Sequence, residues 1–251
     1  MKMSTLTIIG SNGLIGRALV DSTASILSSS PAGHIPGITD VAALARRPLI
    51  DFTLPSKPEF AMTITPDIGA SIPKSTTVLF SALGLTYQKA GSYAAQRAVD
   101  HHLTVEIAKK AKEKCEGHLT TYILVTALFA NSNAWFEHQR IKGDAERDII
   151  ALGFDRTIIL HPGAVLGTRH FATPEEKKEH DRGYYTAALH VVKFLLSTPI
   201  LQRWVAAASV SDADIAKATI QLLKDTDKKG VEIYSCTDMR NLAKKYEEQS
   251  M

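Results

Sequence analysis

The sequence predicts a doubly wound α/β fold, in which helices cover both faces of a parallel sheet. Short β-branched apolar runs alternate with longer segments of helical periodicity along the chain. The first runs are apolar throughout, which is typical of parallel strands covered on both faces. With 251 residues, 45% of them hydrophobic, the chain can bury a full core. We therefore expect one domain over residues 1–251, with a small C-terminal lobe and insertions at about 164–210.

The elements follow from these patterns in chain order. Strands are expected near 4–9, 40–45, 60–65, 77–81, 121–126 and 156–161. Helices are expected near 13–28, 90–115, 137–152, 184–197, 212–224 and 239–248. Turn-forming residues predict surface connections at 28–39 and 48–58, and the charged segment 168–183 predicts a loop over the site. Because ligands of such sheets bind beyond the carboxyl ends of the strands, the residues after each strand are the candidates for a site.

The first strand enters a turn with glycines at 10, 13 and 16, and an apolar helical pattern follows. A side chain at Gly10 or Gly13 would obstruct the turn or hold the backbone away from a pyrophosphate, and Gly16 lets the helix approach the strand. The first N–H groups of the helix favour an anion. A glycine-rich turn without ligand is the alternative, but the position of the motif argues for dinucleotide binding by a Rossmann fold. The residues assigned to this site are Gly10, Ser11, Asn12, Gly13, Leu14, Ile15 and Gly16.

The second strand ends in Arg46 and Arg47, where an NAD-binding site would carry an acid for the ribose hydroxyls. Two guanidinium groups suit a 2′-phosphate by charge and geometry, so this pair favours NADP(H); a solvated arginine pair is the alternative. Asp67, after the third strand, is assigned either to the adenine amine or to the capping of a turn. The fourth strand is followed by small residues that either admit the cofactor ribose or pack strand against loop: Ala82, Leu83 and Gly84.

The helix after the fifth strand carries His138 and Lys142, which are four residues apart and so share one face. A proton donor beside a lysine suits carbonyl reduction, because the cation lowers the pKa of the donor and can also hold the nicotinamide ribose. A solvated helix face is an equally weighted interpretation. Pro162 and Gly163, after the sixth strand, form a turn that either presents its backbone to the nicotinamide amide or is purely structural.

Composition argues against several other kinds of site. The formal net charge of +3 comes from scattered basic residues, which gives no basis for nucleic-acid binding. The two cysteines, Cys115 and Cys236, lack the spacing of a metal site and fit a reducing compartment. The longest apolar stretch, 184–210, is interrupted by charged residues and proline, so we expect no membrane span. Its helix at 184–197 either lies on a membrane surface or, more simply, packs against the domain.

Together these residues resemble the atypical short-chain dehydrogenase/reductase superfamily, and more closely the fungal FMP-type family of mitochondrial outer membrane proteins. That family is related to a human Tat-interacting, NADPH-binding protein. The resemblance covers nearly the whole chain and is carried by residues 10–16, 46–47, 81–91, 131–143 and 153–163. It implies an extended-type Rossmann domain, NADP(H) as cofactor, and peripheral attachment to the cytoplasmic face of the mitochondrial outer membrane, or else a cytoplasmic location.

Three positions depart from the pattern of that family. Its active-site tyrosine falls on His138, while its lysine is retained as Lys142. Its serine falls on Thr126 or Ala127, and its arginine before Pro-Gly is replaced by His161. A histidine is mostly neutral at pH 7, with a reference pKa near about 6.5, and only the imidazolium is a good acid.

Two functions therefore stay open from the sequence. In the first, the protein reduces a small carbonyl compound, with His138 as proton donor, Thr126 as orienting residue and Lys142 on the ribose. In the second, it is a non-catalytic, dinucleotide-dependent regulatory or scaffold protein with an unknown protein partner.

Overall fold

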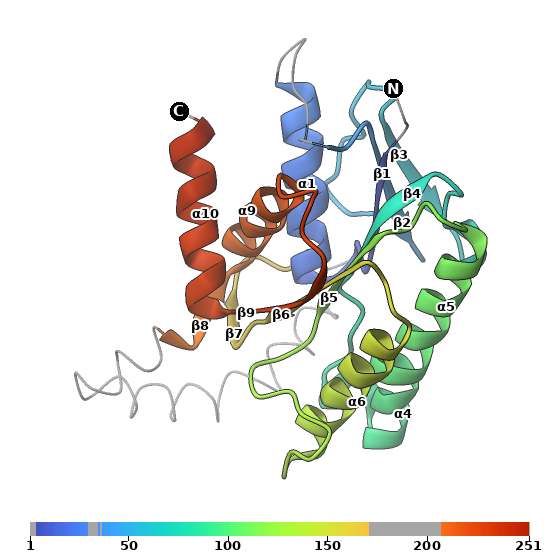
Figure 1. The fold of residues 1–251 in the computed structure, drawn as a ribbon, viewed down its shortest axis with the longest axis vertical. Coiled ribbons are helices and arrows are strands. Elements are labelled where there is room, and N and C mark those ends of the chain that lie inside the picture. Colours follow the sequence, from blue (N-terminus) through green and yellow to red (C-terminus); the bar gives the residue numbers. More distant parts are fainter. Residues whose placement is uncertain (1–3, 30–34, 36, 171–206, 251) are drawn as a thin grey trace.

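A computed structural model describes residues 4–29, 35, 37–170 and 207–250 of the chain. Its central sheet has seven parallel strands in the order β3-β2-β1-β4-β5-β6-β9 (Figure 1). These strands are β1 (Thr5–Ile9), β2 (Asp40–Ala45), β3 (Phe60–Ile64), β4 (Thr76–Ser81), β5 (Thr121–Val125), β6 (Arg156–His161) and β9 (Gly230–Ser235). The strand order reverses between β1 and β4, which is where such sheets bind ligands. The predicted doubly wound fold is confirmed.

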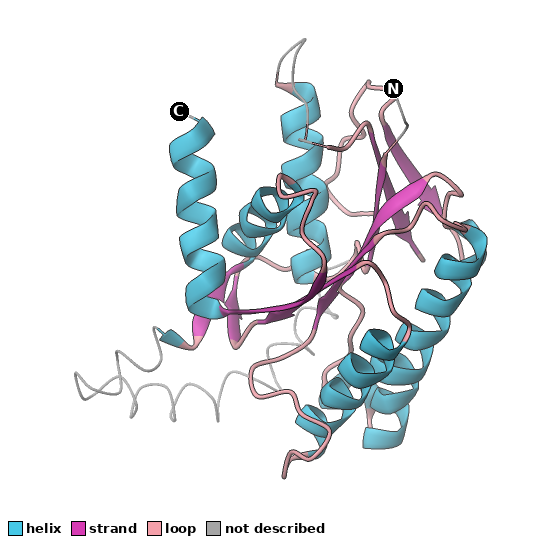
Figure 2. Ribbon diagram, in the orientation of Figure 1, coloured by secondary structure: helices cyan, strands magenta, loops and turns pink. Residues whose placement is uncertain are grey.

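Helices cover both faces of this sheet (Figures 1 and 2). One face is covered by α1 (Leu14–Ser28), α9 (Asp212–Leu223) and α10 (Cys236–Ser250). The other is covered by α2 (Ile68–Ser71), α5 (Thr104–Lys114) and α6 (Glu137–Ala151). The connection from β4 to α5 contains α3 (Tyr87–Ala90), α4 (Tyr93–Arg97) and the π-helix η1 (Ala98–Leu103).

Strand side chains alternate between two apolar clusters, one on each face of the sheet. On β5, Ile123 belongs to the cluster under α1 and α9, whereas Tyr122 and Leu124 belong to the cluster under α5. All three are 2% exposed or less, and burial of one such side chain contributes about 1.5–3 kcal/mol. Burial on both faces explains why the central strands are apolar throughout.

Two predictions about the elements were wrong. The single helix expected over 90–115 is divided, because Gly91 ends α3 in the left-handed conformation at φ 75° and the π-turn of η1 separates α4 from α5. The sequence also did not predict β9, or the two-stranded parallel sheet of β7 (Ala164–Leu166) and β8 (Ser209–Ser211). Val210 of β8 belongs to the same apolar cluster as residues of α9 and α10, and Val165 of β7 packs against it, so the small sheet joins the main domain and a separate C-terminal lobe stays a prediction.

The expected helix 184–197 and most of the expected loop 168–183 lie outside the described residues. Among the helices that the structure describes, none is long and apolar enough to cross a bilayer.

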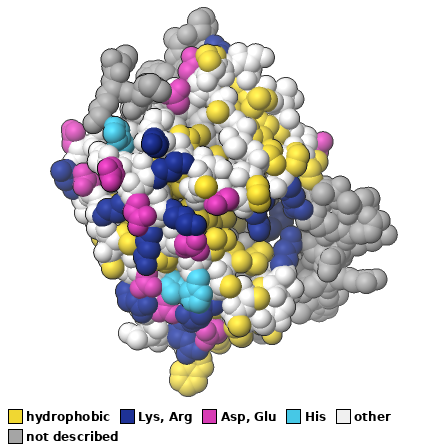
Figure 3. Space-filling model, turned by 90° about the vertical axis from the view of Figure 1, so that its right-hand side faces the viewer, with side chains coloured by type: hydrophobic (Ala, Val, Ile, Leu, Met, Phe, Trp, Pro, Cys, Tyr) yellow, Lys and Arg dark blue, Asp and Glu magenta, His cyan; other side chains and the backbone are white. Residues whose placement is uncertain are grey.

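On the side of the molecule that carries α5 and α6, positive and negative side chains are intermixed (Figure 3). Arg97 of α4 bridges Glu137 and Asp144 of α6 at 3.0 and 2.7 Å, and His101 of η1 lies 2.7 Å from Asp148. Each partly exposed pair contributes little by itself, but together they join α4 and η1 to α6 along its length. This pairing sets the relative position of α4, η1 and α6, the three helices that carry the polar residues of the candidate site.

Candidate cofactor and active site

The glycine turn packs against the loop that follows β4. Gly10 has φ +84°, and a Cβ added there would lie 2.6 Å from the carbonyl oxygen of Ala82. A Cβ on Gly16 would lie 2.3 Å from the carbonyl oxygen of Gly10. The N–H of Gly13 donates to that same carbonyl oxygen at 2.8 Å. Glycine at positions 10 and 16 is therefore required by the close packing of turn, loop and helix.

The N-terminus of α1 opens beside this turn. Its N-cap residue is Gly13, no side chain caps it, and its first turn contains no acidic residue. The N–H groups of that turn and the positive end of the helix dipole are thus not neutralised by a side chain. Asn12 joins the turn to the end of β2 through a 3.1 Å hydrogen bond from Nδ2 to the carbonyl oxygen of Arg47. This arrangement suits a pyrophosphate.

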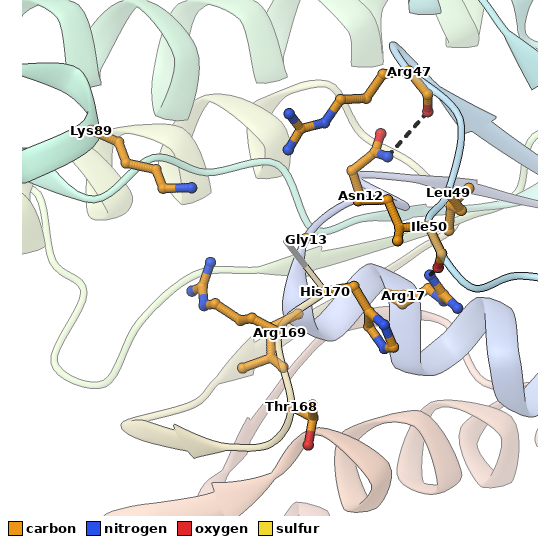
Figure 4. A pocket seen from close by; sticks show the side chains of 11 residues that line it. Asn12, Gly13, Arg17, Arg47, Leu49, Ile50, Lys89, Thr168, Arg169 and His170 are labelled. Atoms are coloured by element: carbon orange, nitrogen blue, oxygen red, sulfur yellow. Dashed lines mark hydrogen bonds between the residues drawn. The ribbon is translucent and has the colours of Figure 1, made fainter. Parts of the chain in front are cut away.

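A pocket lies over the helix N-terminus (Figure 4). The side chains of Arg47, Lys89 and Arg169 point toward a common space beside Gly13. The pocket lining consists of Asn12, Gly13, Leu14, Arg17, Arg47, Leu49, Ile50, Lys89, Thr168, Arg169 and His170. Three cations and a helix N-terminus around one space are an arrangement that suits a ligand with several negative charges.

Sequence reasoning missed Lys89 and Arg169, because no local motif distinguishes them from surface cations; only the fold brings them to Gly13. Arg17 has a different role. Its guanidinium donates to the carbonyl oxygens of Ile50 and Asp51 at 2.6 and 3.0 Å, and its Nε lies 2.8 Å from Asp21. It therefore holds the connection between β2 and β3 in place.

The other residues assigned to the cofactor have separate positions. Arg46 is exposed after β2 and is not among the residues that line the pocket. Ser11 is buried and donates to the carbonyl oxygen of Ile8, whereas Ile15 and Leu83 pack against the two apolar clusters. Asp67 caps α2 by accepting from the N–H of Ala70 at 3.0 Å, so the capping interpretation has a contact and the adenine contact stays a prediction.

Lys142 lies deep beside the loop after β4. Its Nζ is 3.0 Å from Oδ2 of Asp100, and the side chains are 9% and 0% exposed. Oδ1 of Asp100 accepts from the N–H of Leu85 at 2.7 Å. A Cβ on Gly84 would be 3.1 Å from Nζ, so glycine there leaves space for the ammonium group. The predicted lysine therefore has a buried carboxylate partner that the sequence analysis did not identify.

His138 lies one turn before Lys142 on α6 and is held from α4. Its Nδ1 is 2.8 Å from Nε2 of Gln96, a side chain that is fully buried. Burial lowers the pKa of His138, the charge of Lys142 lowers it further, and Asp100 opposes them. The imidazole is thus neutral at neutral pH. The predicted pair is therefore not a solvated helix face: both side chains are tied to η1 and α4.

The close approach of the preceding loop to α6 depends on Gly143. A Cβ there would lie 2.1 Å from the carbonyl carbon of Asn131. Glycine directly after Lys142 therefore allows the 131–132 backbone to lie on the helix.

Thr126 and the Pro162–Gly163 turn are engaged within the protein. The Thr126 hydroxyl is 3.4 Å from the carbonyl oxygen of Leu160, so it is buried at the end of β5. The carbonyl oxygen of Pro162 accepts from the N–H of Leu128 at 2.8 Å, and the N–H of Gly163 lies 3.1 Å from Sγ of Cys236. The structural role of the turn thus has contacts, and its contact with a nicotinamide amide stays a prediction.

His161, at the position of the family's arginine, lies 2.9 Å from Glu146 of α6. Through this contact it joins the end of β6 to the helix that carries His138 and Lys142.

No protein-family model matches the chain. Curated relatives do. A mitochondrial protein FMP52 of Kluyveromyces lactis is 37% identical over 164 residues, which span 65% of this chain and 68% of that protein. The chain belongs to the FMP52 family. The mitochondrial FMP52 of Eremothecium gossypii is 29% identical over 242 residues, covering 94% of this chain and 96% of that protein. The family relationship thus extends over nearly the whole domain.

Solved structures share the fold of this FMP52 family member. The Bordetella bronchiseptica enzyme WbmF in complex with NAD⁺ has a TM-score of 0.60 at 15% identity, over 98% of this chain and 78% of that one. The human epimerase family protein SDR39U1 with NADPH has a TM-score of 0.56 at 16% identity, over 93% and 74%. The fold that frames the site described above is therefore shared with these two solved proteins.

Proposed function

We propose that this FMP52 family protein binds NADP(H) and reduces a small carbonyl compound. The convergence of Arg47, Lys89 and Arg169 on the uncapped N-terminus of α1 carries the proposal. NADP(H) has two negatively charged parts, a pyrophosphate and a 2′-phosphate, and this pocket offers positive charge to both. The similarity in fold to solved complexes with NAD⁺ and NADPH supports the cofactor class.

The preference for NADP(H) over NAD(H) rests on Arg47. It lies just after β2, where the ribose 2′ position falls in this fold, and it lines the pocket. A lost hydrogen bond to a charged group costs about 1.5–3 kcal/mol, so Arg47→Ala should weaken NADPH binding by about 10- to 100-fold. Binding of NADH should change little. Isothermal titration with both cofactors measures this.

Arg46→Ala is the matched control, because Arg46 precedes Arg47 but does not line the pocket. An equal loss of NADPH binding in both variants, or an equal loss of NADH binding in Arg47→Ala, would contradict the assignment of the 2′-phosphate to Arg47.

Bound NADPH would supply the hydride, and the chain would supply positioning. In this proposal Lys142 holds the nicotinamide ribose, Thr126 orients the carbonyl compound, and His138 donates a hydrogen bond to its oxygen. A neutral imidazole polarises the carbonyl but is a poor acid, so we expect slow turnover. Replacement by a phenol, His138→Tyr, should raise NADPH oxidation across a panel of aldehydes and ketones. Unchanged turnover with NADPH still bound would count against the catalytic assignment.

A second candidate function is non-catalytic: NADP(H) binding stabilises a fold that engages a protein partner. The lowered pKa of His138 favours this candidate, because a neutral histidine is a poor proton donor for turnover. Purified protein mixed with NADPH and carbonyl compounds separates the two. Tight binding without oxidation of the cofactor supports the regulatory candidate, and oxidation that depends on His138 supports the enzyme.

For the location, we propose the cytoplasmic face of the mitochondrial outer membrane with peripheral attachment. The curated relatives are named mitochondrial, which supports the organelle. The segment 184–197 is the proposed contact, and it lies outside the described residues. Co-sedimentation with anionic vesicles tests direct attachment, and protease treatment of intact mitochondria tests the face. Protein that stays in the supernatant in the first assay would refute direct attachment.

A further inference from the structure

The side chain of Gln96 is surrounded by hydrogen-bond acceptors. It is fully buried, and its Nε2 lies 2.8 Å from the carbonyl oxygen of Leu85, 2.8 Å from Nδ1 of His138 and 3.4 Å from Oδ2 of Asp100. A carbonyl and a carboxylate oxygen can only accept. The amide must therefore place its NH₂ group, and not its oxygen, on this side. Its two protons serve the two short contacts, to Leu85 and to His138.

This orientation determines the tautomer of His138. Since Gln96 donates to Nδ1, that nitrogen has no proton, and the neutral ring carries its hydrogen on Nε2. Within the described part of the chain, Nε2 has no hydrogen-bond partner, so its N–H is available to a ligand. Protonation of Nδ1 would place two N–H groups against each other, and turning the amide would break its bond to Leu85.

We propose that Gln96 is a positioning residue that holds His138 as the neutral Nε2–H tautomer, so that His138 offers a bound carbonyl compound a hydrogen bond and not a transferable proton. That His138 faces the carbonyl compound rests on the proposed function. The tautomer itself follows from the contacts of Gln96 alone.

A single substitution should reverse the tautomer. In Gln96→Glu the side chain keeps its size, but it can no longer donate to the carbonyl oxygen of Leu85 and it adds a carboxylate near Asp100. An ionised carboxylate beside Nδ1 can only accept, so the ring then carries its proton on Nδ1. The charged groups around the ring are Lys142, from the same helix, and Asp100, from η1. An adjacent carboxylate raises the pKa of a histidine by about 1–3 units. The variant should therefore bind a second proton near neutral pH and gain an imidazolium that can transfer one.

Nitrogen-15 NMR of the full chain tests this inference. Two-bond nitrogen–proton correlations distinguish the tautomers, and His138→Asn identifies the signal. We expect Nε2–H in the natural protein, Nδ1–H with a pKa raised by about one unit or more in Gln96→Glu, and no reversal in Gln139→Glu. Gln139→Glu is the matched control, because it adds the same charge at the residue that follows His138 in the sequence. In the described part of the chain, the contact of Gln139 with the preceding loop is made by its backbone carbonyl oxygen, which accepts from the N–H of Asn131.

An Nδ1–H signal in the natural protein would overturn the inference, and so would an unchanged tautomer in Gln96→Glu. The first measurement needs no variant, so it decides even if Gln96→Glu fails to fold. Failure of the proposed function has a different signature: the expected tautomers would be present, while NADPH titration shows no binding or the carbonyl panel shows no turnover.

Discussion

The buried pair between Lys142 and Asp100 predicts a specific pattern of stability loss. The two charges are 3.0 Å apart and are shielded from solvent, so the pair is not a screened surface contact. In Asp100→Asn the amide oxygen can still accept from the N–H of Leu85, but the NH₂ group then faces Nζ of Lys142, so the variant removes both the charge and the acceptor. Leaving a buried charge without its partner costs about 3–5 kcal/mol. For a domain of this length the melting temperature should fall by about 6–20 °C.

The double variant separates charge pairing from other contributions. Lys142→Met leaves the carboxylate unpaired and should lose about 3–5 kcal/mol of unfolding free energy as well. In Asp100→Asn/Lys142→Met no unpaired charge remains, so the loss should be no larger than in either single variant. Urea unfolding at neutral pH, followed by circular dichroism, gives all four free energies. Additive losses in the double variant would refute the reasoning, because they would mean that the two groups do not interact.

Three further predictions concern the glycines and His138. Gly10→Ala should lose about 2–5 kcal/mol of unfolding free energy, because the new side chain is strained in the left-handed conformation and also clashes with the backbone of Ala82. Gly91→Ala has the same backbone strain but open space around the new side chain, so it should lose about 1–2 kcal/mol. Urea unfolding compares the two. Gly143→Ala should lower the melting temperature by displacing the 131–132 backbone, as calorimetry would show. Folding lowers the pKa of His138, whereas in the unfolded chain the residue has the reference pKa of about 6.5. As the pH falls below about 6.5, the unfolded chain therefore binds more protons than the folded protein, and the free energy of unfolding should decrease. In His138→Gln this contribution to the pH dependence of the unfolding free energy should be absent, as urea unfolding curves recorded between about pH 5 and 8 would show. An unchanged pH dependence in the variant would contradict the prediction.

Much of the fold could be predicted because burial on both faces gives the central strands an unmistakable apolar pattern. Each of the six predicted strands is present, although β3 lies at one edge of the sheet and only its Phe60 is buried. The strand that was missed, β9, lies at the other edge of the sheet, where Val231 and Ile233 are 49% and 56% exposed. Between them Glu232 pairs with Arg156 of β6 at 2.6 Å. An edge strand with one exposed face and an ion pair on the other carries a weaker signal.

The candidate site also contains a part that the sequence predicted and a part that it did not. The glycine turn is a local motif, so sequence alone indicated it. Gln96 and Asp100 were missed because a polar pair at helical spacing is ordinarily solvated; only the packing of α4 and η1 on α6 buries it. The available signal was the spacing itself: Gln96 and Asp100 are four residues apart, as are His138 and Lys142. Two such pairs on neighbouring helices can form two parallel contacts.

The loop after β4 connects the cofactor turn to the polar residues of the candidate active site. At its start, the carbonyl oxygen of Ala82 lies against Gly10. At its end, the backbone of Leu85 bonds to both Gln96 and Asp100. Four residues thus join the turn that would hold a pyrophosphate to the amide that sets the tautomer of His138. A shift of this loop on cofactor binding would reach His138 through Gln96, so the nitrogen-15 signal of His138 should respond to NADPH even if no substrate is turned over.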